Sequence, residues 1–136
     1  MKYRIGTHKD HAEIEDIIAS TDYYPPVDAS LMDGTFVVAE HPDGQLVACA
    51  WVMHYGRNAF LDYLAVRPAW QHKGIAVKLL VKVRHILKRR GVRYVRSQIH
   101  LSNVEALRVA VAMGSALHSP YALCFTDLGA PKNGNQ

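Results

Sequence analysis

The sequence predicts a mixed α/β domain with a mostly antiparallel sheet, and three observations support this prediction. Two β-type segments, 35–40 and 45–54, flank a His-Pro-Asp-Gly turn whose residues favour a hairpin. The apolar segment 59–66 is typical of a strand, and it leads through a glycine turn into a basic amphipathic helix. A returning strand at 94–100 completes a crossover, which places two neighbouring strands in parallel.

The segments before the hairpin are predicted from local pattern. Residues 3–6 form a short first strand, and residues 10–20 have helical periodicity with Thr7 as a candidate N-cap. The expected buried stripe of this helix consists of Ala12, Ile14, Ile17 and Ile18. Residues 21–28 must form a loop, because two consecutive prolines remove backbone donors and disfavour helix in the residue before them.

Two further helices follow the hairpin. The helix over 74–90 ends before Gly91, and its expected buried face consists of Ile75, Leu79, Val83, Ile86 and Leu87. The next helix begins at Ser102, which forms a capping-box pattern with Glu105. Its expected inward face consists of Val104, Leu107, Val111 and Gly114.

Length and composition indicate one domain. The 136 residues suit a single core, which we expect over 1–128, and the polar tail 129–136 lacks large apolar residues and is expected to be disordered. No apolar run approaches the roughly 20 residues that span a bilayer. We therefore expect a cytoplasmic protein without a membrane partner.

The charge balance is basic, with 16 Lys and Arg against 12 Asp and Glu and a net charge of +4. Much of the excess lies on the helix over 74–90, ending in Lys88, Arg89 and Arg90. Such a patch is compatible with a nucleic-acid-binding module, since phosphate contacts dominate that affinity. The commoner explanation is a solvated helix face beside an anionic cofactor, so nucleic acid is the less favoured partner.

Cysteine and histidine usage gives no metal or thiol site. Cys49 and Cys124 lie in apolar strand segments and are expected to be buried. The eight histidines are scattered, and only His8 and His11 have helical ligand spacing, without a Cys or Glu arranged around them. We expect no bound metal.

The glycine turn after residue 66 is the most informative segment. A strand that turns into a helix presents free backbone N–H groups at the positive end of the helix dipole, where a diphosphate binds well. The turn has neither the P-loop pattern nor the dinucleotide pattern. Its sequence, Gln71-x-x-Gly74-x-Ala76, resembles the acetyl-CoA signature of the GNAT N-acetyltransferase superfamily.

The resemblance extends over about residues 3–128, because the predicted elements follow the order of that family. Asn103 to Ala106 also match the family's Asn-x-x-Ala start of the next helix. The resemblance implies a sheet with one parallel, splayed strand pair flanked by helices. It also implies acetyl-CoA as the co-substrate.

Cofactor-binding residues follow from the resemblance. Backbone groups of Leu64, Ala65 and Val66 pair with the pantetheine arm. The diphosphate lies on the N–H groups of Gln71, His72, Lys73, Gly74, Ile75 and Ala76. Asn103 has two open interpretations, because it either contacts the cofactor or only begins a helix.

Asp62 is the candidate general base. It stands where relatives carry an acidic residue, in an otherwise apolar strand, and burial there raises a carboxyl pKa toward a useful range. The alternative interpretation is a structural Asp satisfied by a nearby loop. The family also implies a backbone N–H near Leu64 that stabilises the developing oxyanion.

Ala110 is the main departure from the family. Relatives commonly place there a Tyr whose hydroxyl protonates the leaving thiolate, which a methyl group cannot do. Tyr121 is our candidate substitute, with His118, His100 or a water as alternatives. The departure also supports a second interpretation, a catalytically weak or inactive acyl-CoA-binding regulatory domain.

Tyr23 and Tyr24 are candidates for binding the acceptor amine, because the family builds part of the acceptor pocket in this loop. The alternative is that both rings only pack the loop. The short segment 115–121 leaves an open groove, compatible with a small-molecule, protein or peptide amine, or with a pocket completed by a second copy in a homodimer. The sequence thus predicts an N-acetyltransferase in which a primary amine attacks directly in a ternary complex.

Overall fold

A computed structural model describes residues 1–99, 103–112, 114, 116–118 and 123–129. The chain first forms β1 (Lys2–Ile5), a 3-10 turn η1 (His8–Asp10), α1 (His11–Ala19) and a second 3-10 turn η2 (Ala29–Leu31). It continues through β2 (Thr35–Glu40), β3 (Leu46–Tyr55), β4 (Asn58–Val66), η3 (Pro68–Trp70) and α2 (Ile75–Arg89). The described elements end with β5 (Tyr94–Gln98), α3 (Val104–Ala112), β6 (Ala116–His118) and β7 (Leu123–Asp127).

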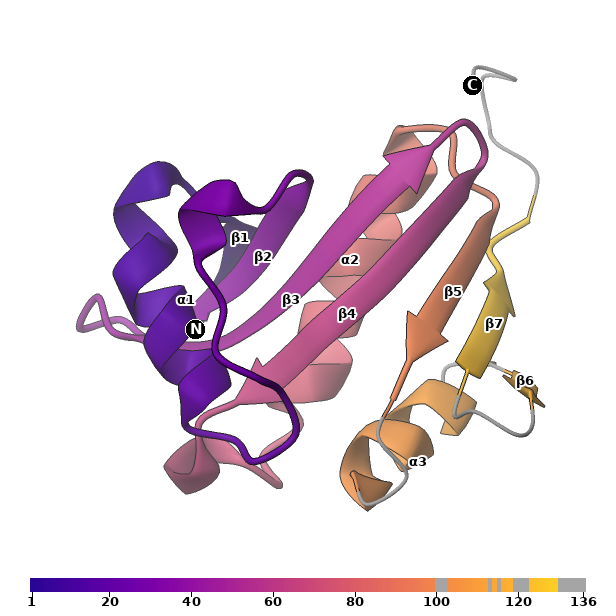
Figure 1. Ribbon diagram of the computed structural model, residues 1–136. Coiled ribbons are helices and arrows are strands. Elements are labelled where there is room, and N and C mark those ends of the chain that lie inside the picture. The colour runs from indigo at the N-terminus through magenta and orange to yellow at the C-terminus, as the bar shows by residue number, and fades with distance from the viewer. Residues whose placement is uncertain (100–102, 113, 115, 119–122, 130–136) are drawn as a thin grey trace.

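The strands form one mixed sheet in the order β1-β2-β3-β4-β5-β7-β6 (Figure 1). The pair β4 and β5 is parallel, and the other pairs are antiparallel. The predicted hairpin connects β2 and β3 through residues 41–44, where the His41 N–H donates to the Gln45 carbonyl at 2.8 Å. The predicted fold class is therefore confirmed.

Helices α1 and α2 cover opposite faces of this sheet (Figure 1). Neighbouring residues of β2 show the alternation, because Val37 packs in the cluster that contains α2 and Val38 packs in the cluster that contains α1. All five residues predicted for the buried face of α2 are buried. On α1 the three isoleucines are buried, whereas the prediction for Ala12 was wrong because its short side chain faces solvent.

Gly91 ends α2 as predicted. Its backbone has φ +82°, and its N–H donates to the Lys88 carbonyl at 3.1 Å. The Val92 N–H reaches back to the Leu87 carbonyl at 3.0 Å. These two bonds form a Schellman motif, which turns the chain directly into β5.

The predicted inward face of α3 was wrong in part. The partly buried Leu107 packs inward as predicted, but Val104 and Val111 are half exposed and Gly114 is exposed, whereas Ala106 and Ala110 are buried against Ile99. The two valines and the two alanines each have a spacing that suits one helix face, so periodicity alone favours the larger side chains. The two alanines face inward and leave open space beneath the helix.

Strand β4 contains a bulge opposite β3. Cys49 pairs with Ala65 and Trp51 pairs with Asp62, so one residue of β3 faces both Tyr63 and Leu64. Tyr63 has φ +53°, a left-handed conformation that side chains larger than glycine rarely adopt. The bulge places Tyr63 against the α1 cluster and Leu64 against the α2 cluster.

The parallel pair opens at its end, as the resemblance implied. Within the described residues, the register of β4 with β5 ends at Leu61 and Ser97, although β4 continues to Val66. The end of β4 therefore borders a gap between the two strands. No helix among the described residues is long and apolar enough to cross a membrane.

Candidate active site

The turn before α2 holds its backbone open toward solvent. Gly74 has φ +78°, and a Cβ built on it would meet no heavy atom within 4 Å. The side-chain amide of Gln71 donates to the Val66 carbonyl at 3.0 Å and so fixes the turn to the end of β4. The first N–H groups of the fifteen-residue helix α2 therefore face open space at its positive end.

A groove of about 400 Å³ begins at this turn. It runs between the end of β4 and α3, and most of the residues predicted to bind the cofactor line it: Leu64, Ala65, Val66, Gln71, His72, Gly74, Ile75, Ala76 and Asn103. Lys73 is exposed and is not among the lining residues. The structure therefore brings together nine of the ten positions that the sequence selected.

Asn103 serves as the helix cap in this structure. Its Oδ1 accepts a hydrogen bond from the Ala106 N–H at 3.3 Å, and the residue is 8% exposed. Ser102, the cap predicted from the sequence, lies outside the described residues. Asn103 also lines the groove, so the two interpretations of this residue are compatible.

Residues that the sequence did not select complete the groove. Trp70, Glu105 and Val109 line it, and His72 Nδ1 lies 3.8 Å from Glu105 Oε2. This contact links the turn to α3 when His72 is protonated. Glu105 also pairs with Arg108 at 3.5 Å, which gives that arginine a local partner on the same helix. Val109 lies three residues after Ala106, which puts both on one face of a helix. This spacing could have identified Val109 as a groove residue from the sequence.

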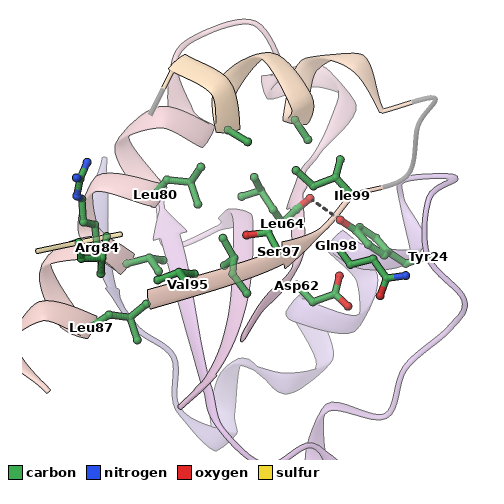
Figure 2. Close-up of a pocket in the computed structure, with 15 residues that line it drawn as sticks. Tyr24, Asp62, Leu64, Leu80, Arg84, Leu87, Val95, Ser97, Gln98 and Ile99 are labelled. Atoms are coloured by element: carbon green, nitrogen blue, oxygen red, sulfur yellow. Dashed lines mark hydrogen bonds between the residues drawn. The ribbon is translucent and has the colours of Figure 1, made fainter. Parts of the chain in front are cut away.

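A second cavity adjoins the groove, and Leu64 and Ala106 line both. Figure 2 shows the side chains of Tyr24, Asp62 and Gln98 gathered at one end of this cavity. Gln98 and the buried Ser97 come from β5 and were not selected from the sequence. Buried and exposed residues alternate along β5, and this alternation could have identified Ser97 as an inward-facing residue.

The Asp62 carboxylate is the acidic group at this end. Burial raises its pKa, and a hydrogen bond from the Tyr63 N–H to Oδ1 at 2.7 Å opposes that shift. Among the described residues, the carboxylate accepts its hydrogen bond from the adjacent backbone and not from a loop, so the alternative of a structural tie to a loop finds no support in these contacts. Asp62 is half buried and reachable from the cavity.

Tyr24 and Tyr23 occupy different places. Tyr24 lines the cavity, donates its hydroxyl to the Leu64 carbonyl at 3.3 Å and lies against the Tyr63 ring at 5.1 Å between centroids. Tyr23 instead lines the groove. Burial raises the Tyr24 pKa, so its hydroxyl keeps its proton. The other predicted catalytic residue, Tyr121, lies outside the described residues, as does His100.

The described side chains offer no competing thiol or metal site. Cys49 is fully buried, and burial raises the pKa of its thiol to about 12. The described residues contain no group of three or more His, Cys, Asp or Glu side chains suited to a metal ion.

The basic end of α2 has local explanations. Lys88 and Arg89 lie in its last turn, where cations interact favourably with the helix dipole. Arg90 donates to the Thr35 hydroxyl at 3.0 Å.

Comparison with known families adds the deciding observation. The Acetyltransferase (GNAT) family matches residues 2–114, most of the chain. The chain belongs to the GNAT acetyltransferase family. Membership of this GNAT family supports an acyltransferase, and a comparison with curated protein sequences finds no significant match.

Solved structures of GNAT proteins share the fold. A putative acetyltransferase, yncA from Salmonella typhimurium, solved with acetyl-CoA, aligns with a TM-score of 0.80 at 18% identity, covering 95% of this chain and 94% of that one. The ribosomal-protein-S18-alanine N-acetyltransferase from Escherichia coli aligns with a TM-score of 0.74 at 17% identity, covering 92% of this chain and 90% of that one. Tetrahymena GCN5 aligns with a TM-score of 0.74 at 13% identity, covering 95% of this chain and 97% of that one. At these identities the likeness shows the fold alone.

Proposed function

We propose that this protein is an N-acetyltransferase that transfers the acetyl group of acetyl-CoA to a primary amine by direct attack in a ternary complex. The observation that carries the proposal is that the groove at the glycine turn of α2 adjoins the cavity of Asp62 at the end of β4, where Leu64 lines both. The yncA structure with acetyl-CoA, in the same fold, supports the choice of co-substrate.

The turn fits a diphosphate. The open space over Gly74 and the N–H groups of residues 71–76 give an anion a close approach to the backbone at the helix N-terminus. Leu64, Ala65 and Val66 supply strand backbone for the pantetheine arm, at the point where β4 is no longer paired with β5. Asn103 and Ala106 form the opposite wall.

The bound thioester supplies an activated acetyl group, whose carbonyl carbon bonds to the amine nitrogen as its bond to sulfur breaks. Asp62 takes the proton that the attacking amine gives up, and burial raises its pKa, which makes the carboxylate a stronger base. We assign to the backbone N–H at the bulge near Leu64 the role of stabilising the negative charge that develops on the carbonyl oxygen. Tyr121 stays our candidate for protonating the thiolate.

The acceptor enters on the side of Tyr24, where Tyr24, Asp62 and Gln98 offer a hydroxyl, a carboxylate and an amide to an amine. Tyr23, in contrast, is assigned to the cofactor side because it lines the groove. A small-molecule amine and a protein or peptide amine both suit this arrangement. We propose the compartment to be the cytoplasm and the whole of 1–128 to act as one domain, with a homodimer as a possible assembly.

The test follows free thiol released from acetyl-CoA in the presence of a panel of primary amines. The wild type should release thiol with at least one amine, and Asp62→Asn should lower that rate by roughly a hundredfold or more while acetyl-CoA still binds. Asp33→Asn, a change at an exposed aspartate, is the matched control. An unchanged rate in Asp62→Asn would remove this carboxylate from the mechanism.

Ala110 favours one second candidate function, an acyl-CoA-binding regulatory domain without turnover. Its side chain carries no proton donor, and it lies in the wall of the cavity. Binding of acetyl-CoA without thiol release for any amine is the result that this candidate predicts.

A further inference from the structure

The cavity that holds Asp62 has an apolar end, which we call the inner branch. Away from Tyr24 it passes between α2, α3 and β5, and its walls are apolar: Leu80, Val83, Leu87, Val95 and Leu128 line it. Figure 2 shows Leu80, Leu87 and Val95 at the end opposite Tyr24 and Asp62. Arg84 contributes its stem there, as long cationic side chains commonly do.

This branch exists because α3 presents alanines to the sheet. Ala106 and Ala110 are each 7% exposed, and Ile99 is the large residue that packs against them. Any longer side chain at position 110 would project into the cavity. An empty apolar cavity of this kind costs stability, so a ligand that fills it gains binding energy.

The cavity adjoins the proposed thioester position. Leu64 and Ala106 line both the cofactor groove and this cavity. We therefore expect a chain that extends from the acyl carbon near Leu64 to meet the apolar walls. The amine side, with Tyr24 and Asp62, lies at the other end of the same cavity.

We propose that the inner branch binds the hydrocarbon chain of a short acyl-CoA, so that this protein takes a butyryl group better than an acetyl group. The inference rests on the proposed function, since it assumes that the groove holds coenzyme A. The volume of the whole cavity, including its end at Tyr24 and Asp62, is about 60 Å³, and it sets an upper limit on the length of the chain. A cavity of about 150 Å³ holds the six carbons of benzene, so this cavity has room for at most roughly two carbons beyond acetyl.

Isothermal titration of the full chain with acetyl-CoA and butyryl-CoA tests the inference. Two buried methylenes should make butyryl-CoA bind roughly tenfold more tightly in the wild type. Ala110→Leu fills the branch, so it should abolish that preference while acetyl-CoA still binds. Ala112→Leu adds the same side chain at an exposed position of the same helix and should keep the preference.

Ala110→Val adds a smaller side chain and should reduce the preference for butyryl-CoA in part. This variant replaces Ala110→Leu in the test if the leucine variant does not fold. Equal affinities of the wild type for both ligands would overturn the inference, as would a preference that survives in an Ala110 variant that binds acetyl-CoA normally. Failure of the wild type to bind either ligand, in contrast, would overturn the proposed function itself. The two failures are therefore distinguishable.

Discussion

The Tyr24 hydroxyl donates a hydrogen bond to the carbonyl oxygen of Leu64 across 3.3 Å, which ties the loop after α1 to the bulge of β4. The same loop passes Asp62, and the Tyr24 ring lies against Tyr63. One contact therefore joins the proposed amine side of the site to the strand that receives the cofactor.

Tyr24→Phe should weaken acceptor binding. Loss of one hydrogen bond of about 1 kcal/mol frees the loop, so the acceptor KM should rise roughly fivefold while the Kd of acetyl-CoA changes little. Steady-state kinetics and titration measure the two quantities. Tyr55→Phe, at an exposed tyrosine of β3, is the control, and a KM that stays at the wild-type value would show that the Tyr24 hydroxyl has no role in acceptor binding.

Asp62→Asn should stabilise the fold at neutral pH. Burial raises the pKa of Asp62 above its unfolded value, so ionisation disfavours the folded state. That cost is absent below the unfolded pKa and complete above the folded one. Chemical denaturation near pH 7 should therefore show a more stable variant, and the difference from wild type should vanish near pH 3. A loss of stability at pH 7 would instead indicate a structural role for the carboxylate.

The wild-type pH profile should show two proton losses. The free amine and the ionised Asp62 are both required, so log kcat/KM should rise with slope two at low pH and with slope one above the pKa of Asp62. Because burial raises that pKa, the break should lie above the ordinary value of about 3.9. Asp62→Asn should show slope one throughout, and a wild-type profile without a break would contradict the assignment of the base.

Asn103→Ala should cost about 1 kcal/mol of stability, because it removes the cap that accepts from the Ala106 N–H. Asn103→Ser should restore most of this stability, since serine caps helices well. If acetyl-CoA binding also recovers in Asn103→Ser, the residue acts as a cap. If binding stays weak while stability recovers, Asn103 contacts the cofactor, and thermal unfolding together with titration separates these results.

Most of the fold could be predicted from the sequence because its signals are local. The hairpin turn at 41–44, the apolar stripe of α2 and Gly91 at its end each specify a backbone conformation on their own. The bulge at Tyr63 could not be predicted, because it depends on pairing between two strands rather than on one stretch of chain.

The inward face of α3 was mispredicted in part for a similar reason. Val104 and Val111 are seven residues apart and Ala106 and Ala110 are four apart, and both spacings suit one face of a helix, so only packing against Ile99 decides which pair is buried. The loop residues Tyr23 and Tyr24 are adjacent in sequence, yet they line different spaces. The residues of the turn could be placed beside the groove from the sequence because a glycine and a helix start specify that backbone locally.

The most direct test of the central claim is titration of acetyl-CoA into wild type, Gly74→Glu and Gly44→Glu. Gly44 also has positive φ and open space around it, in the turn between β2 and β3, so its variant reproduces the backbone strain away from the groove. The wild type and Gly44→Glu should bind alike, whereas Gly74→Glu should bind at least tenfold more weakly because its carboxylate enters the diphosphate space. Equal affinity of Gly74→Glu and wild type, or no binding by the wild type, would contradict the claim that this turn holds coenzyme A.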